Sequence, residues 1–481
     1  MNKPITKFLS TIVLSIAFLS ITTTAFATQK ISIKKQNSKK EVSLIVLGEY
    51  VVTMNDDQMV IKDGAVAVSG NKILAVGSRK GIEKKYQSSK VIKGESKILM
   101  PGLVNGHTHT AMTLFRGMAD DLELMTWLSN YIFPMEAQFV DPEFIKIGTR
   151  LACWEMIRGG TTSFVDMYFY PEVISEETIK CGLRGVIGSA SIDFPSPGFE
   201  GWGDSFKHAV NYVENWQGKH ERITPAFAPH APYTVSPAHL KQVADKAREL
   251  NAPITIHLAE SLTESETIKK QYNSTPVQHV YDQGMMDGIQ LIAAHMVHPT
   301  SDEIKLVSGK TVGAIHNPTS NLKLASGISP VAEMLKSGAL VGIGTDGAAS
   351  NNDLDLWEEM RLAALLHKVR ENDSTVLPAL TALKMATSMG AKAVGLGDVT
   401  GQLKSGMRAD MIQVSLDDLR LLPLYDVISH LVYVVDSNDV TTTIVSGELL
   451  MENKKVLTID EVELKKLVRG KADEMARALR E

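Results

Sequence analysis

Short apolar runs alternate with longer amphipathic stretches between about Leu99 and Gly397. This alternation is typical of repeated βα units, in which each buried strand is followed by a longer connecting helix. Eight of the runs have the length of strands, and eight parallel strands close into a barrel. The pattern therefore predicts an α/β fold with a (β/α)8 barrel. The strands are expected over residues 99–105, 161–167, 183–189, 224–228, 253–257, 289–295, 312–316 and 341–345.

Both ends of the chain carry a different pattern, of short β-branched runs separated by turn residues such as Gly70-Asn71 and Gly447. Runs of this kind predict strands and hairpins. Because they lie at both ends, we expect them to form one small β-sandwich. A surface helix is expected over residues 459–480, where Ala, Leu, Lys and Glu recur at helical spacing. The sandwich runs cover residues 43–53, 65–76, 409–414, 441–445 and 448–451.

The first 27 residues have the pattern of a secretory signal peptide. Lys3 and Lys7 precede an apolar run over residues 8–21, and Ala25-Phe26-Ala27 forms a small-x-small cleavage site. The run is shorter than the roughly 20 residues that a spanning helix needs, so we expect cleavage near Ala27 rather than a membrane anchor. The mature chain is then periplasmic or secreted. The predicted division is 1–27 for the signal peptide, 28–98 for the first part of the sandwich, 99–400 for the barrel, and 401–481 for the rest of the sandwich and the terminal helix.

Composition narrows the classes of partner. With 481 residues, 44% of them hydrophobic, the chain can bury one large core and a smaller companion domain. The formal net charge of -5 excludes the basic excess that holds a phosphate backbone, so a small molecule is expected and nucleic acid is not. Cys153 and Cys181 lie outside any metal-binding or redox spacing, and a fold of this size needs no disulfide. We expect buried thiols rather than a bridge, and the pattern leaves their redox state open.

The barrel prediction also says where functional residues should lie. In such barrels the active site is at the carboxyl ends of the strands. Candidate histidines and one aspartate stand at several of these predicted ends. They are His107 and His109 after the first strand, His230 after the fourth, His257 at the end of the fifth, His295 at the end of the sixth, and Asp346 after the eighth.

His107 and His109 stand two residues apart at the end of the stretch PGLVNGHTH. Alternate residues of an extended strand point to the same side, so both imidazoles can bind one cation. An isolated pair of this kind is more often an ordinary polar feature of a strand end. Its coincidence with His257, His295 and Asp346 at other strand ends indicates a metal site instead.

The ligand types suggest which metal the site takes. Three imidazoles and one carboxylate suit zinc, with iron or manganese as alternatives. Some barrels hold a second metal with a carboxylated lysine from strand four, but residues 226–230 read AFAPH and contain no lysine. We therefore expect one divalent cation.

Six motifs together resemble those of the amidohydrolase superfamily. Within it, the sequence is similar to the 5-methylthioadenosine/S-adenosylhomocysteine deaminases and to their chlorotriazine-hydrolase relatives. The resemblance covers almost the whole chain after the signal peptide. The motifs are PGLVNGHTH (101–109), FAPHAPY (227–233), IHLAES (256–261), AAHMVH (293–298), HNPTSNLKLASG (316–327) and GTDGAASNN (344–352).

The resemblance implies a role for each residue at the metal. His107, His109, His257 and Asp346 bind the cation, which lowers the pKa of a bound water from about 15.7 toward about 7. Asp346 also accepts the proton of that water and hands it to departing ammonia. Glu260 protonates the ring nitrogen beside the attacked carbon. The role implied for His295 is a hydrogen bond to the oxygen of the tetrahedral intermediate.

The resemblance also implies a substrate. His230 matches a substrate-binding histidine, Glu136 matches a glutamate that accepts from two ribose hydroxyls, and Glu260 and Asp346 contact the reacting ring. An arginine is expected where a deaminase meets the carboxylate of S-adenosylhomocysteine, but residues 194–204 contain none. The predicted activity is metal-dependent hydrolytic deamination of an adenosine-type nucleoside to the inosine analogue. Neutral substrates such as methylthioadenosine or adenosine are favoured over S-adenosylhomocysteine.

Two alternatives remain at this point. A hydrolase of another heteroaromatic ring, such as a triazine, guanine or a pterin, would share the metal and the barrel, and only Glu136 leans toward a ribose. A non-catalytic periplasmic protein on an inactivated barrel would have lost a ligand or Glu260, yet all are present. A homo-oligomer is possible, although no sequence feature marks an interface.

Overall fold

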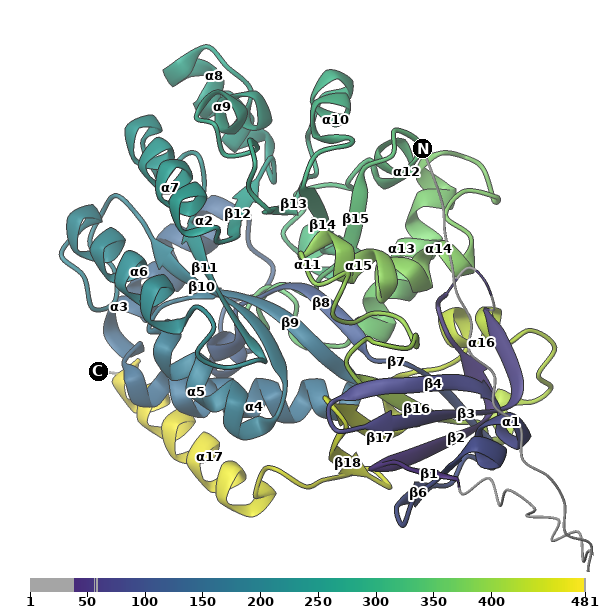
Figure 1. Cartoon of the computed structure of the whole chain (residues 1–481). Helices are drawn as coiled ribbons and strands as arrows, with labels where there is room; N and C mark the ends of the chain where they lie inside the picture. Colours follow the sequence, from purple (N-terminus) through teal and green to yellow (C-terminus); the bar gives the residue numbers. More distant parts are fainter. Residues whose placement is uncertain (1–38, 56, 58, 480–481) are drawn as a thin grey trace, which may run out of the picture. The chain divides into compact units, whose positions relative to one another are not determined.

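Eight parallel strands form the centre of the molecule. The computed structural model describes residues 39–479 apart from 56 and 58, so the predicted signal peptide lies outside the described residues. The strands are hydrogen-bonded in sequence order, and the Asp346 N–H donates to the carbonyl of His107 over 2.9 Å, which joins the last strand to the first. The predicted (β/α)8 barrel is therefore confirmed (Figure 1). Its strands are β8 (Leu103–Thr108), β9 (Thr161–Tyr168), β10 (Arg184–Ser191), β11 (Ile223–Pro229), β12 (Ile254–Leu258), β13 (Leu291–His295), β14 (Val312–His316) and β15 (Leu340–Ile343).

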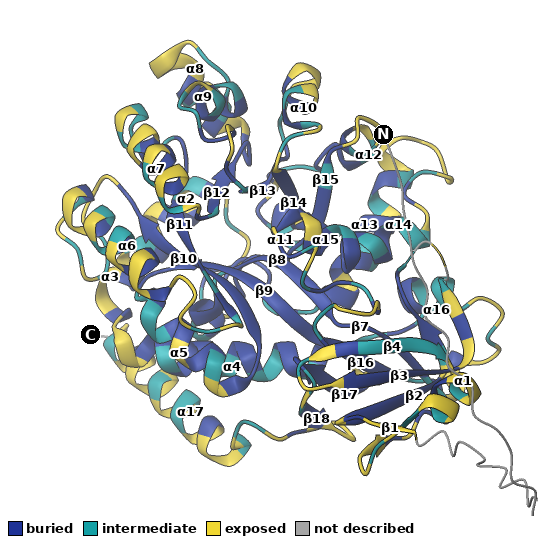
Figure 2. Cartoon of the chain, viewed as in Figure 1, coloured by how far each residue is buried: buried dark blue, intermediate teal, exposed yellow. Residues whose placement is uncertain are grey.

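Helices follow the strands and bury one face against them, while the outer faces of helices such as α6 and α7 are exposed (Figure 2). The local sequence sets their ends. In the longest helix of the barrel, Asp141 accepts from the N–H of Phe144 at the start, and Gly160 with φ of 82° ends it. The barrel helices are η1 (Thr110–Phe115), α2 (Leu124–Trp127), the π-helical η2 (Leu128–Ile132), α3 (Phe133–Phe139), α4 (Pro142–Gly159), α5 (Pro171–Cys181), α6 (Trp202–Trp216), α7 (Pro237–Leu250), α8 (Leu262–Tyr272), α9 (Pro276–Asp282), α10 (Ser301–Val307), α11 (Pro318–Lys323), α12 (Val331–Lys336), α13 (Leu356–Arg370), α14 (Ala379–Met385) and α15 (Ser388–Ala393).

The amino ends of the barrel strands enclose an apolar core. Six strands contribute one side chain each to it, and α15 packs across it. Gly313 permits this contact, because a Cβ there would lie 2.0 Å from the carbonyl oxygen of Ala393. One end of the barrel is thus filled, and polar chemistry is left to the other end. The strand residues of this core are Val104, Val165, Val186, Ala226, Ile292 and Ile315.

Both chain ends combine in a second sheet of nine strands, as predicted for the sandwich domain. Side chains of β2 alternate between two cores: Leu44 and Val46 face one, and Ile45 and Leu47 face the other. The first of these cores also holds Met411 and Ile444 from the far end of the chain. The sheet comprises β2 (Leu44–Val52), β3 (Val60–Ser69), β4 (Lys72–Ser78), β6 (Val91–Ile92), β7 (Lys97–Pro101), β16 (Met411–Ser415), β17 (Val440–Val445), β18 (Glu448–Glu452) and β19 (Lys455–Val456).

The remaining elements lie outside these two sheets. The helix expected over residues 459–480 is present as α17, whose Glu461 accepts from the indole N–H of Trp154 on α4 over 3.1 Å. None of the helices among the described residues is long and apolar enough to cross a membrane. The other elements are β1 (Lys40–Glu41), α1 (Arg79–Lys85), β5 (Tyr86–Gln87), η3 (Leu419–Leu421), α16 (Val427–Tyr433), η4 (Ser437–Asp439) and α17 (Glu461–Ala478).

The first predicted barrel strand, residues 99–105, is in fact two strands. β7 ends at Pro101 and pairs with β16 in the sandwich sheet, whereas β8 begins at Leu103 and opens the barrel. Gly102 lies between them, where a Cβ would come within 2.1 Å of Thr162. The sandwich therefore continues to Pro101, beyond the expected limit at residue 98. Both strands are buried, so a single apolar run does not show that it serves two sheets.

A buried ion pair joins the sandwich to the barrel. Arg184, the first residue of β10, donates from Nε to Asp410 Oδ2 over 2.9 Å and from Nη2 to Asp410 Oδ1 over 3.2 Å. Asp410 also accepts from the backbone N–H of Ser446 over 2.7 Å. The two side chains are 2% and 0% exposed, so each charge depends on the other for compensation.

Candidate metal centre and active site

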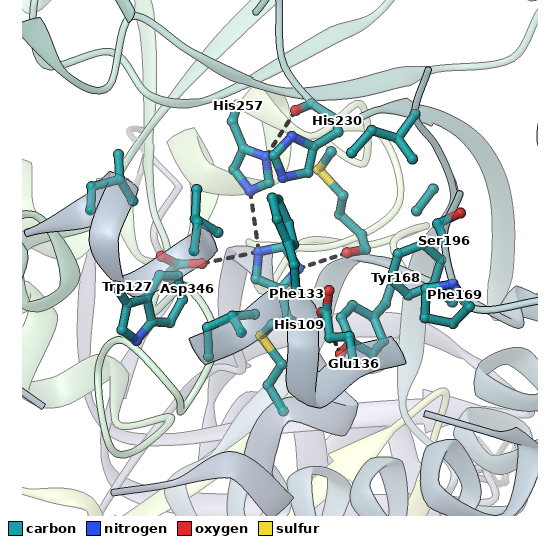
Figure 3. A pocket seen from close by; sticks show the side chains of 18 of the residues that line it. His109, Trp127, Phe133, Glu136, Tyr168, Phe169, Ser196, His230, His257 and Asp346 are labelled. Carbon is teal, nitrogen blue, oxygen red and sulfur yellow. Dashed lines mark hydrogen bonds and ion pairs between the residues drawn. The ribbon is translucent and has the colours of Figure 1, made fainter. Parts of the chain in front are cut away.

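Four side chains that could hold a metal ion converge at the carboxyl ends of the barrel strands. His107 lies on β8, His109 one residue beyond its end, His257 on β12, and Asp346 shortly after β15. Their donor atoms all lie within 4.8 Å of one another. Asp346 Oδ1 is 3.3 Å from Nε2 of His107 and 3.2 Å from Nε2 of His109. Figure 3 shows His109, His257 and Asp346 facing one another across the pocket.

The hydrogen bonds of the imidazoles use Nδ1 of His109 and His257, so their Nε2 atoms are available to bind a cation. His109 Nδ1 lies 2.6 Å from the carbonyl of Met167, and His257 Nδ1 lies 2.8 Å from the carbonyl of His230. Both rings therefore donate from Nδ1, and their Nε2 atoms face each other over 3.2 Å. Nε2 of His107 is buried without a hydrogen-bond partner among the described residues. A divalent cation satisfies all of these atoms together, so the donor set fits one.

Charge at the cluster supports the same conclusion. Burial lowers the pKa of His107 to about 4. Burial also acts to lower the pKa of His109, but a hydrogen bond and the negative charge of Asp346 outweigh it and raise that pKa to about 9. Burial would raise the pKa of Asp346, yet the two histidines hold it well below its ordinary range. The carboxylate thus keeps a positive charge beside it, and a cation would take the place of the proton on His109.

Asp346 is itself held by side chains that sequence reasoning missed. Its Oδ2 accepts from the hydroxyls of Ser320 over 2.7 Å and Ser350 over 2.9 Å. Its Oδ1 accepts from the N–H of Gly347 over 2.8 Å. Both serines lie inside motifs that carried the family resemblance, and this was the available signal. Their partner could not be read from the sequence, because Ser320 lies 26 residues away from Asp346.

His109 is positioned by Asp166 of β9, another residue that sequence reasoning missed. Asp166 Oδ1 accepts from the N–H of Thr110 over 2.6 Å and from the hydroxyl of Thr108 over 3.1 Å. These two residues flank His109 in the chain. Oδ2 of Asp166 is buried without a hydrogen-bond partner among the described residues. One carboxylate oxygen therefore bonds the residues on both sides of His109, the backbone of one and the hydroxyl of the other.

Glu260 and His295 lie beside the metal-ligating cluster. Glu260 Oε2 is 3.8 Å from His295 Nε2, and both side chains are buried. Burial raises the pKa of Glu260, and the negative charge of Asp346 adds to the rise. His295 Nδ1 lies 2.9 Å from Asn321 Oδ1 and 3.3 Å from Asn317 Nδ2, and its Nε2 lies on the side of Glu260. A carboxyl with a raised pKa can donate a proton inside the pocket.

The backbone that carries Glu260 is fixed by Glu264, which sequence reasoning also missed. The Glu264 carboxylate accepts from the N–H groups of Ala259 over 3.0 Å and Glu260 over 2.7 Å. Ala259 has a φ of 53°, in the left-handed region that non-glycine residues rarely adopt. The two hydrogen bonds compensate this strain at the point where the chain leaves β12.

Beyond the cluster, the pocket extends to a volume of about 880 Å³. Glu136 lines it from α3, and its Oε1 accepts from the hydroxyl of Tyr168 over 2.7 Å. Burial raises the pKa of Glu136 to about 7. His230 also lines the pocket, with Nδ1 2.9 Å from the Thr234 hydroxyl, and burial lowers its pKa to about 3.

The rest of the pocket wall is largely apolar. Trp127 and Phe133, which Figure 3 labels, belong to it, together with Phe169 and Phe194. Among the described residues that line the pocket, none is a lysine or an arginine. Every site residue named from the sequence lines this pocket except His107, which is fully buried within the same cluster.

A (β/α)8 barrel that gathers three imidazoles, a carboxylate and a buried acid at the carboxyl ends of its strands is the architecture of a metal-dependent hydrolase. The family model described as "Amidohydrolase family" matches residues 98–450, and the chain belongs to this family. It is a hydrolytic enzyme that acts on a small molecule.

Similar proteins agree with this placement. A 5-methylthioadenosine/S-adenosylhomocysteine deaminase of Pelotomaculum thermopropionicum is 46% identical over 420 residues, which cover 87% of this chain and 95% of the relative. A 5'-deoxyadenosine deaminase of Methanosarcina mazei is 43% identical, with 90% and 98% covered. The crystal structure of an adenosine deaminase from Xanthomonas campestris with bound zinc is 38% identical, with a TM-score of 0.89 and 91% and 100% covered.

Proposed function

We propose that this enzyme hydrolyses the exocyclic amino group of an adenosine-type nucleoside, to give the inosine analogue and ammonia. The observation that carries the proposal is the order of groups along one pocket. The metal-ligating cluster and Glu260 stand at its inner end, and Glu136 stands within the same cavity with one oxygen already bonded to Tyr168. The names of relatives that are 40–46% identical support the same substrate class.

Proton transfer is assigned to two carboxyl groups. Glu260, whose pKa burial raises, donates a proton to the ring nitrogen beside the attacked carbon and makes that carbon electrophilic. Asp346 keeps its carboxylate ionised between two histidines, so it accepts a proton from the attacking water and returns it to the departing amine. His295 faces the pocket with Nε2 and stabilises the oxygen that develops charge.

The proposed cofactor is one zinc ion held by His107, His109, His257 and Asp346. When bound, it supplies a Lewis acid that makes a water molecule acidic near neutral pH. The zinc in the similar adenosine deaminase supports this choice. Metal analysis of purified protein, together with loss of turnover after chelation and its recovery with zinc, tests the assignment.

Two features of the pocket select the rest of the nucleoside. Glu136 presents a carboxylate that accepts from vicinal ribose hydroxyls. The wall around Trp127, Phe133 and Phe194 is apolar and, among the described residues, carries no cationic side chain to meet an amino-acid carboxylate. We infer that neutral 5'-substituted adenosines are preferred to S-adenosylhomocysteine.

A panel of substrates tests the proposal. Purified protein is given 5'-methylthioadenosine, adenosine, S-adenosylhomocysteine, guanine and a chlorotriazine, and released ammonia is measured together with the ultraviolet change from adenine to hypoxanthine. We expect turnover of the first two, with kcat/KM for S-adenosylhomocysteine at least roughly tenfold lower, because a buried carboxylate without a partner is costly. Turnover of only guanine or the triazine would show that the substrate is another heteroaromatic ring and not an adenosine-type nucleoside.

We also propose that the chain is exported and that residues 1–27 are removed. Support comes from the basic, apolar and small-x-small order of that segment. Amino-terminal sequencing of protein from the periplasmic fraction is expected to start at Thr28. Protein found only in the cytoplasm with Met1 intact would overturn this.

A further inference from the structure

The two cysteines of the chain meet on the outside of the barrel. Cys153 lies within α4, and Cys181 is the last residue of α5, the helix packed beside it (Figure 1). No other cysteine occurs among the 481 residues. Both thiols are free in the structure, and the residues are 0% and 2% exposed.

An ion pair one turn away shows how the two helices face each other. Arg150 on α4 and Glu177 on α5 are joined from Nε to Oε2. Cys153 follows Arg150 by three residues and Cys181 follows Glu177 by four, so the next turn of each helix presents its thiol to the same seam. Burial and the neighbouring Cys181 side chain raise the pKa of the Cys153 thiol there, so the two thiols lie next to each other. A pair of neighbouring thiols is the arrangement from which a disulfide forms.

The pair lies away from the active site. Cys181 ends α5 shortly before β10 begins at Arg184, and therefore lies toward the amino ends of the barrel strands. It lines a second pocket of about 490 Å³, together with Arg150, Thr458 and Glu463. A small oxidant can approach Cys181 through this pocket without entering the catalytic one.

We propose that Cys153 and Cys181 form an intramolecular disulfide that joins α4 to α5 when the chain folds in an oxidising compartment. This site is independent of the proposed reaction. The oxidant is a disulfide compound, either a small molecule such as oxidised glutathione or a protein. The Cys181 thiolate attacks one sulfur of the oxidant and releases a first thiolate. The Cys153 thiolate then attacks the Cys181 sulfur and releases the second. Both protein protons pass to the released thiolates, so the oxidant gains the two electrons.

Burial determines when the bond forms. It raises the pKa of the Cys153 thiol well above its ordinary range, and only the thiolate is a strong nucleophile. Closure is therefore fast while the chain is folding and slow once α5 has packed on α4. The same burial protects the finished bond from reductants.

A thiol count tests the proposal. The full chain is unfolded with dithiothreitol, refolded in oxidised and reduced glutathione, quenched with acid, and labelled with N-ethylmaleimide in guanidinium before its intact mass is measured. We expect no maleimide on the refolded protein and two after reduction. Two maleimides without reduction, or one maleimide with one glutathione, would overturn the proposal. If refolding fails, the same labelling is applied to acid-quenched protein isolated from an oxidising compartment.

Two variants serve as controls. Cys153→Ser has a single thiol and is expected to carry one maleimide or one glutathione in every sample. The melting temperature of the oxidised wild-type protein is expected to exceed that of the reduced protein by roughly 3 °C, because the bond closes a loop in the unfolded chain. Cys153→Ala/Cys181→Ala should show no such dependence on redox state. A dependence that persists in the double variant would contradict the assignment, and kcat should be the same in both redox states.

Discussion

At the carboxyl ends of the barrel strands, Ala259, His295 and Asp346 hold left-handed backbone conformations, and buried acids and imidazoles crowd together. At the amino ends, Val104, Val165 and neighbouring apolar side chains fill the barrel beneath α15. The carboxyl end keeps strained backbone and desolvated charge, both of which cost stability, in positions where chemistry requires them. The apolar packing at the amino end stabilises the fold and offsets this loss of stability. The predictions below test this division of labour.

The largest expected effect lies at the carboxyl end. Glu260→Gln removes the proton donor while keeping the size of the side chain, so we expect kcat to fall by about 10²–10⁴-fold. The melting temperature should stay within about 1 °C of the wild type, since the amide replaces a buried acid. Steady-state kinetics and calorimetry check both. Glu266→Gln, on the exposed face of α8, is the matched control and should change neither.

The opposite result is expected at the joint between barrel and sandwich. Arg184→Met leaves Asp410 buried without its partner, and such a loss costs about 3–5 kcal/mol of unfolding free energy. The kcat of the folded protein should not change. Denaturant unfolding measures the loss. Arg79→Met breaks an exposed pair instead and should cost less than about 1 kcal/mol. A large fall in kcat for Arg184→Met would contradict the separation between residues that stabilise the fold and residues that act in catalysis.

A third prediction separates support from chemistry within the carboxyl end. Asp166→Ala removes the acceptor that holds the backbone around His109, so we expect cation affinity to fall about 10–100-fold. Asp166→Asn retains a carbonyl oxygen in place of Oδ1 and should recover most of that affinity. Competition with a chelating dye measures the dissociation constant directly. Equal affinity in all three proteins would show that Asp166 is structural only.

The smallest expected effect concerns pH. Because the pKa of Glu136 is about 7, its carboxyl is increasingly protonated below that pH and loses an acceptor for ribose. We expect KM for adenosine to rise several-fold between about pH 8 and pH 6, whereas KM for 2',3'-dideoxyadenosine stays flat across that range. Parallel pH profiles of the two substrates check this. If KM changed with pH in the same way for both substrates, Glu136 would not be the group that recognises the ribose.

Much of the fold could be predicted from hydrophobic periodicity, because strand and helix patterns are local. All eight barrel strands lie where the apolar runs are, and the terminal helix α17 lies within its expected range. The exception is informative. Residues 98–104 form one continuous apolar run, and β7 joins the sandwich sheet through its pairing with β2 and with β16, which lies about 300 residues farther along the chain.

The candidate site divides in the same way. His107, His109, His257 and Asp346 were recognisable because each marks the end of a strand, and parallel strands bring their carboxyl ends together. Ser320, Asp166 and Glu264, which hold these groups and Glu260 in place, carry no such mark. Their contribution depends on hydrogen-bond distances and on burial, and neither follows from residue spacing.

The sequence by itself determined the class of barrel and the candidate metal ligands, since the order of the strands and the types of residue at their ends can be read along the chain. Only the tertiary structure decided which oxygen of Asp166 or Asp346 is occupied, that Arg184 meets Asp410, and that Cys153 meets Cys181. These contacts join residues far apart in the chain, and their energies depend on exclusion of water, which arises only once the whole core has closed.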